Sequence, residues 1–267
     1  MIKVLRGLNN DSKLFESGSK YLECVVKEIE ELAIYPRLNS YRDVVLLALL
    51  DRILTTSRAV LCLVEQGFCD QAFGLSRTVV EAFFSLRYIQ NKDSEARAKR
   101  YLDYFAKDRE HLLKMIGKHH PNLSNIRSSD HEQLEMANQF KSPHSWFPED
   151  KKLKDVAFED STWAFDEAGE PENQKYSYDI IYKLTSHEVH STSVALEPRI
   201  ADFSTCSRLP TAFKFCTSQP LSAGDNAVVN ACNHSHHALV CVFHAFGFEI
   251  PSAVQTAFNE WELAAIG

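Results

Sequence analysis

Residues 75–88 contain an arginine and a glutamate whose spacing permits a joint chemical role. Arg77 and Glu81 are four residues apart, so a helix places both side chains on one face, where they can pair. Their neighbours are almost all apolar, which predicts a buried pair, and Asp51 and Arg58 on the preceding predicted helix extend it into a polar seam. A stranded buried charge costs about 3–5 kcal/mol. Two interpretations follow: an ion-pair network that fixes helix register, or a cleft in which Arg77 binds an anion.

A second polar group lies in the segment IIYKLTSHEVHSTS. Tyr182, Ser186 and His190 recur every fourth residue, and His187 lies three residues before His190. On a helix the first three form one column of two hydroxyls and an imidazole, and histidine suits proton transfer at neutral pH. Ser186 and His190, one helical turn apart, resemble a nucleophile and a base, but no G-x-S-x-G turn is present. For nucleophilic catalysis we favour the alternative, a hydrogen-bonding seam at a helix end; for membership of a polar pocket we favour a functional role.

Histidines also recur along residues 224–246. His234, His237 and His244 share one stripe with Cys241. Zinc needs three or four ligands, one helix usually supplies two, and neither H-E-x-x-H nor paired Glu-x-x-His motifs occur. Core or interface histidines are therefore the favoured interpretation, and a metal site on His234, His237 and His244 is the less favoured one.

Composition narrows the class of protein. The chain has 267 residues and a formal charge of −7, which disfavours non-specific adhesion to nucleic acid. The basic residues of 92–118 are interleaved with acidic ones, which predicts a solvated helix face. Seven cysteines without a C-x-x-C pair indicate reduced thiols. The amino-terminal residues do not resemble a signal peptide, and the apolar run 44–50 is too short for a bilayer. We expect a soluble cytoplasmic protein that does not enter a membrane.

Helices are predicted to position these residues. Only nine glycines and nine prolines interrupt the chain, and long stretches favour helix. The predicted helices span residues 12–34, 41–66, 70–90, 95–118, 130–140, 174–190, 224–246 and 251–264. We predict an all-α fold: an up-and-down bundle of four long amino-terminal helices with carboxy-terminal helices packed on it. A single domain covers 1–267, with an irregular acidic insertion or lid at 119–173.

The polar motifs together resemble a known family. The pattern Arg-Thr-x2-Glu at 77–81, the pair Arg100-Tyr101 and the pattern Tyr-x3-Ser-x3-His at 182–190 resemble an uncharacterised bacterial family, a domain of unknown function, over residues 40–195. The resemblance carries no established activity. It implies a helical fold and one common site formed by Arg77, Glu81, Tyr101, Ser186 and His190.

The leading hypothesis is a polar cleft that binds or acts on a phosphate. Arg77 binds a phosphate or carboxylate, Glu81 orients or deprotonates, and His190 carries a proton, with Ser186 beside it. Substrate contacts are assigned to Arg100, Tyr101, Tyr182 and His187. A small phosphorylated ligand, nucleotide or nucleic-acid end fits the arginine fork, in a role in defence or stress. The alternative is a non-catalytic interaction or sensor module, part of a toxin–antitoxin or defence pair, that works as a homodimer or with a protein partner. A metal-dependent bundle enzyme is a third hypothesis.

Overall fold

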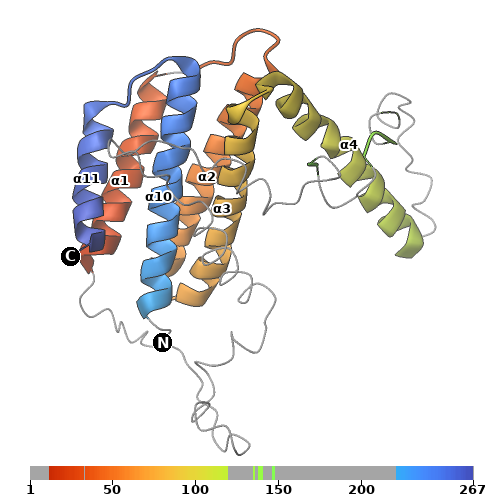
Figure 1. Ribbon diagram of the computed structural model, residues 1–267. Helices are drawn as coiled ribbons and strands as arrows, with labels where there is room; N and C mark the ends of the chain where they lie inside the picture. Colours follow the sequence, from red (N-terminus) through yellow and green to blue (C-terminus); the bar gives the residue numbers. More distant parts are fainter. Residues whose placement is uncertain are drawn as a thin grey trace, which may run out of the picture. The chain divides into compact units, whose positions relative to one another are not determined.

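The computed structural model describes residues 12–32, 34–119, 135, 138–140, 146–147 and 221–266. Six helices and no strand occur within these ranges, which confirms the all-α prediction (Figure 1). The helices are α1 (Ser12–Leu32), α2 (Tyr41–Glu65), α3 (Cys69–Asn91), α4 (Ser94–His119), α10 (Leu221–Phe246) and α11 (Ser252–Ile266). Their ends lie within three residues of the predicted ones. The predicted helix 174–190 and most of 130–140 lie outside the described residues. None of the six helices is long and apolar enough to cross a membrane.

Two helices end through the same glycine motif. Gly67 follows α2 with φ of 82°, and Gly247 follows α10 with φ of 76°, a left-handed conformation that glycine adopts without steric cost. The amide of Phe68 then donates to the carbonyl of Leu63 at 2.8 Å, and the equivalent bond follows α10. These bonds satisfy carbonyls that the helix end leaves open. Local sequence therefore sets both ends.

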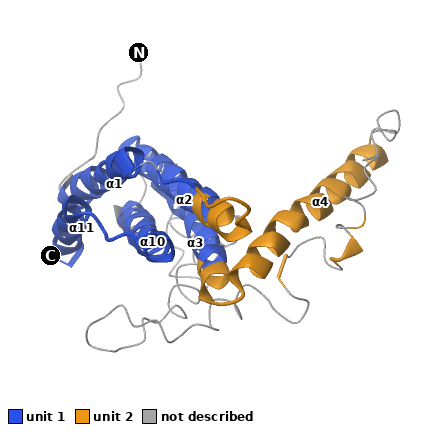
Figure 2. Cartoon of the chain, turned by 90° about the horizontal axis from the view of Figure 1, so that it is seen from above, with its two compact units in different colours: residues 1–35, 48–86, 176–267 blue, residues 36–47, 87–175 orange. Residues whose placement is uncertain are grey.

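The chain separates into two compact units (Figure 2). Unit 1 comprises Met1–Tyr35, Ala48–Leu86 and Tyr176–Gly267, and unit 2 comprises Pro36–Leu47 and Arg87–Lys175. Unit 1 therefore contains α1, α10, α11 and most of α2 and α3, whereas unit 2 contains α4, the start of α2 and the end of α3. The predicted single domain with an insertion at 119–173 stays a prediction, because most of that segment is not described.

Helix α10 lies at the centre of unit 1 (Figure 2). It bonds or packs against α1, α2, α3 and α11. Gly18 of α1 marks the closest approach: a Cβ at this position would lie 3.0 Å from the Cys232 sulfur and 3.1 Å from a Val228 methyl carbon. The missing side chain lets the two helices pack closely. Burial raises the pKa of the Cys232 thiol, which keeps it protonated in this apolar contact.

A buried polar network follows one face of α10. The Ser57 hydroxyl lies 2.9 Å from that of Ser235, Asn230 Nδ2 donates to the Ser76 hydroxyl at 3.3 Å, and His234 Nδ1 donates to the Asn230 carbonyl at 2.8 Å. All five residues are buried. These bonds satisfy polar groups that would otherwise be costly inside the unit. The five residues of this network therefore lie on α10 and on its neighbours α2 and α3.

A second contact on α10 joins it to α1 and α11. The Tyr21 hydroxyl lies 3.2 Å from His236 Nδ1, and the His236 ring stacks on Phe258 at a centroid distance of 3.5 Å and an interplanar angle of 9°. Burial raises the pKa of Tyr21, so its hydroxyl stays protonated and neutral in its hydrogen bond with the imidazole nitrogen. The hydrogen bond and the stacked rings together position three helices.

Candidate functional site

The Arg77–Glu81 pair forms as predicted, but near the surface of unit 1. Arg77 Nε lies 2.9 Å from Glu81 Oε1, and the side chains are 17% and 40% exposed. Asp51 and Arg58 are both exposed, so the predicted polar seam is wrong. They belong to a stripe of exposed residues on α2 at 51, 55, 58 and 62, which is one helix face turned outward. The expectation failed because α2, although apolar on most of its circumference, still presents this stripe to solvent.

The remaining predicted site residues fall into two groups. Tyr182, Ser186, His187 and His190 lie outside the described residues, and their roles stay predictions. Arg100 and Tyr101 belong to unit 2, whereas Arg77 and Glu81 belong to unit 1. Their membership of one common site therefore also stays a prediction.

The histidines of α10 occupy different environments. His234 is buried and bonded to a backbone carbonyl, His237 is half-buried beside Phe83, and His244 is exposed. No three His, Cys, Asp or Glu side chains in the described ranges are grouped as a bound metal ion would require. The three histidines thus do not converge on one point, and His234 has a structural partner.

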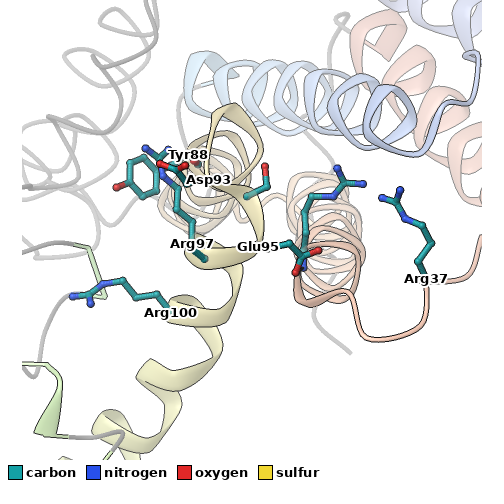
Figure 3. A pocket seen from close by; sticks show the side chains of 9 residues that line it. Arg37, Tyr88, Asp93, Glu95, Arg97 and Arg100 are labelled. Atoms are coloured by element: carbon teal, nitrogen blue, oxygen red, sulfur yellow. Dashed lines mark hydrogen bonds between the residues drawn. The ribbon is translucent and has the colours of Figure 1, made fainter.

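A cavity of about 820 Å³ lies within unit 2 (Figure 3). Its walls come from the start of α2 and the segment before it, from the end of α3, and from the first two turns of α4 and the turn before them. The lining residues are Arg37, Arg42, Tyr88, Asp93, Ser94, Glu95, Ala96, Arg97 and Arg100. Four arginines thus face two carboxylates, which gives the lining a formal charge of 4 − 2 = +2. This arginine pocket is the candidate site.

Arg100, a substrate contact predicted from the sequence, makes three contacts beside this pocket. Its Nε donates to the Trp146 carbonyl at 2.8 Å and its Nη2 to the Phe147 carbonyl at 3.5 Å. Its guanidinium carbon lies 4.6 Å from the centroid of the Phe140 ring. The Tyr101 ring packs edge-on against the Trp146 ring at a centroid distance of 5.0 Å. Tyr101 is not among the described residues that line the pocket, so its observed contact is with Trp146, whose carbonyl binds Arg100.

Arg97 is the functional candidate that sequence analysis missed. It is only 9% exposed, its Nη1 donates to the Tyr88 carbonyl, and its guanidinium carbon lies 3.7 Å from the centroid of the Tyr88 ring. Across the described part of the chain, neither Arg97 nor Arg100 has a carboxylate within ion-pair distance. Carbonyl oxygens and aromatic rings hold both cations but do not neutralise them. The one available signal was their spacing of three residues, which places them on one helix face.

The other two arginines of the pocket share the single carboxylate of Asp43. Arg37 Nε and Nη2 lie 2.6 and 2.8 Å from its carboxylate, and Arg42 Nε and Nη2 lie 3.0 and 2.9 Å away. The Arg37 backbone amide adds a bond of 3.0 Å. Asp43 is fully buried. The Arg37 guanidinium holds the pKa of the Asp43 carboxyl below its usual value, so the group stays ionised.

Ser40 and Glu95 connect this ion cluster to α4. Ser40 caps α2, because its hydroxyl accepts the Asp43 amide at 3.1 Å and donates to Glu95 Oε1 at 2.6 Å. Glu95 Oε2 accepts the amide of Arg42 at 3.2 Å. The Glu95 carboxylate thus lies at the positive amino-terminal end of α2, where negative charge is stabilised. On the Asp43 side of the pocket the charges are paired with one another, whereas Arg97 and Arg100 have no carboxylate partner among the described residues.

Comparison with known proteins identifies one family. Residues 43–205, more than half of the chain, match the model of a family of unknown function, DUF5677. No curated protein matches the chain, and no solved structure matches it. The match agrees with the resemblance seen over residues 40–195, and it includes Asp43, Arg97 and Arg100 of the pocket. The chain therefore belongs to the DUF5677 family, whose function is unknown.

Proposed function

We propose that this protein binds a small phosphorylated ligand in the arginine pocket of unit 2. The observation that carries the proposal is the pair of cations on α4, Arg97 and Arg100, held by backbone carbonyls and not neutralised by a carboxylate among the described residues. A buried cation without a counter-ion is costly, and a bound anion removes that cost. Because the two side chains are already fixed, binding loses little side-chain entropy.

Phosphate is an anion whose oxygens fit the donors of these two residues. A guanidinium presents a planar fork of donors that matches two phosphate oxygens, and charge makes these hydrogen bonds stronger than neutral ones. The first turn of α4 also lines the pocket, and helix amino-terminal amides favour anions. The cavity volume is in the range of small-ligand sites, about 300–1,000 Å³. A nucleotide, the class predicted from the sequence, is one phosphorylated ligand of this size.

Arg37 and Arg42 have a different role in this proposal. Their donors already bond the Asp43 carboxylate, so they form the wall of the pocket and add little charge for a ligand. We therefore expect the affinity for phosphate to depend mainly on Arg97 and Arg100.

The proposal is tested by calorimetric titration with inorganic phosphate and with AMP. Arg100→Gln removes one charge-assisted contact and should weaken binding about 10- to 100-fold, since such a contact contributes about 1.5–3 kcal/mol. Arg109→Gln, which removes the same charge from an exposed position on α4, is the matched control and should bind as the wild type does. Far-UV circular dichroism must be the same for all three proteins.

Two results would overturn the proposal: no binding by the wild type at roughly 10 mM of either compound, or equal affinity of Arg100→Gln and the wild type. Either result would favour the alternative from the sequence, a non-catalytic interaction module whose polar residues stabilise its fold. A role in defence or stress is a separate hypothesis, which this titration does not address.

A further inference from the structure

Only two of the described residues that line the arginine pocket, Tyr88 and Ala96, have an aromatic or aliphatic side chain. Its one aromatic residue, Tyr88, is 6% exposed, and the Arg97 guanidinium covers one face of its ring at 3.7 Å. Its one aliphatic residue is Ala96. Nucleobases are commonly bound by stacking on an aromatic ring or by packing on apolar side chains. This lining therefore has few side chains on which a nucleobase could stack or pack, and it favours a ligand that is polar throughout.

The pocket also contains hydrogen-bond acceptors that a phosphate alone would not use. Asp93 lies in the turn between α3 and α4, beside Arg97 and Tyr88 (Figure 3). Its φ of 48° is in the left-handed region, which is uncommon for a residue with a side chain. The Asp93 carboxylate is exposed, and among the described residues it has no hydrogen-bond or ion-pair partner. The hydroxyl of Ser94 lines the pocket next to it.

The Asp93 carboxylate repels a second phosphate but accepts hydrogen bonds from hydroxyls. A carboxylate accepts two hydroxyl donors at once, and neighbouring hydroxyls on a sugar ring present such a pair. A ligand with a phosphate on Arg97 and Arg100 and hydroxyls near Asp93 would pair the positive arginines with an anion. Its hydroxyls would donate hydrogen bonds to the negative carboxylate.

We infer that the ligand of this pocket belongs to the class of phosphorylated sugars or polyols, with its phosphate on Arg97 and Arg100 and its hydroxyls on Asp93. The inference rests on the proposed function, because it assigns the phosphate to the same arginines. It adds the chemistry of the remainder of the ligand and a role in specificity for Asp93.

The test compares inorganic phosphate, ribose 5-phosphate and AMP in calorimetric titrations of the full chain. We expect the wild type to bind ribose 5-phosphate about tenfold more tightly than inorganic phosphate, and AMP no more tightly than ribose 5-phosphate. Asp93→Asn should remove the preference for ribose 5-phosphate without weakening the binding of inorganic phosphate. Asparagine tolerates the left-handed backbone, so this variant keeps the turn. Asp51→Asn, an exposed change of the same charge on α2, should keep the preference.

The outcomes separate this inference from the proposed function. If AMP binds at least tenfold more tightly than ribose 5-phosphate and Arg100→Gln abolishes that binding, the sugar-phosphate inference is wrong and phosphate binding stands. If Asp93→Asn leaves the preference for ribose 5-phosphate unchanged, the role of Asp93 is wrong and the inference is overturned. If the wild type binds none of the three compounds, both the inference and the proposed function are refuted.

Discussion

The Asp43→Asn substitution provides a sharp test of the charge cluster in unit 2. Asp43 is fully buried and accepts five hydrogen bonds, from the side chains of Arg37 and Arg42 and from the Arg37 amide. Asparagine has nearly the same shape but no charge, and its NH2 group would face donors in place of one acceptor oxygen. The change therefore removes the charge while it preserves the volume of the side chain.

The expected loss follows from the contacts and from the exposure of the partners. A hydrogen bond to a charged group contributes about 1.5–3 kcal/mol, and bonds within one network are not additive. The Arg37 side chain is 63% exposed, so water replaces part of its interaction when the carboxylate is gone. We therefore expect the free energy of unfolding to fall by about 2–3 kcal/mol at pH 7.

The stabilisation by the Asp43 carboxylate depends on pH, and the direction of this dependence follows from its pKa. The pKa of Asp43 is lowered in the folded protein, first by its hydrogen bond from Arg37. Its contribution is therefore complete above the unfolded-state pKa of about 3.9 and is lost as the pH falls through the lower folded-state value. The difference between the wild type and Asp43→Asn should stay constant from pH 7 to about pH 5 and shrink below about pH 4.

Urea unfolding followed by far-UV circular dichroism measures this difference at each pH. Asp51→Asn, an exposed aspartate on the same helix, is the control and should change stability by less than about 0.5 kcal/mol. A loss below about 0.5 kcal/mol at pH 7 for Asp43→Asn, or a loss that does not change with pH, would refute the proposed role of the ionised carboxylate.

Three further predictions concern unit 1. Glu81→Gln should lower stability by no more than about 0.5 kcal/mol in urea unfolding, because its pair with Arg77 lies near the surface and is partly exposed; a loss above about 1 kcal/mol would show that the pair is more deeply buried in solution. His236→Phe keeps the stacked ring but removes the hydrogen-bond partner of the Tyr21 hydroxyl, so it should cost about 1–3 kcal/mol by the same assay, and unchanged stability would contradict that hydrogen bond. Gly18→Ala should lower the melting temperature, although alanine favours helix, because overpacking costs about 1–3 kcal/mol; a higher melting temperature would contradict the close contact.

Sequence patterns predicted the helices well because the signals are local. The ends of α2 and α3 follow from Gly67, from capping residues and from apolar periodicity, all of which act within a few residues. The division into two units could not be predicted in this way. It depends on which helices pack together, and the four amino-terminal helices are similar in length, at 21, 25, 23 and 26 residues.

The site was predicted less completely, for a physical reason. Arg100 was identified through its pairing with Tyr101, but Arg97 was interpreted as one of many charges on a solvated helix. Nothing in the local sequence shows that Tyr88 and the distant segment 146–147 would supply carbonyls to these two cations. Likewise, Ser57 and Ser235 are far apart in the chain, and only the packing of α2 on α10 brings their hydroxyls together.

The central place of α10 has a consequence for how the chain acquires its structure. Helices α1, α2 and α3 leave the ribosome long before residues 221–246, yet their apolar faces close on that late segment. A nascent chain that ends before residue 221 therefore exposes an unfilled core, and contacts of such long sequence separation form slowly. A truncated product lacking α10 should depend on chaperones or aggregate.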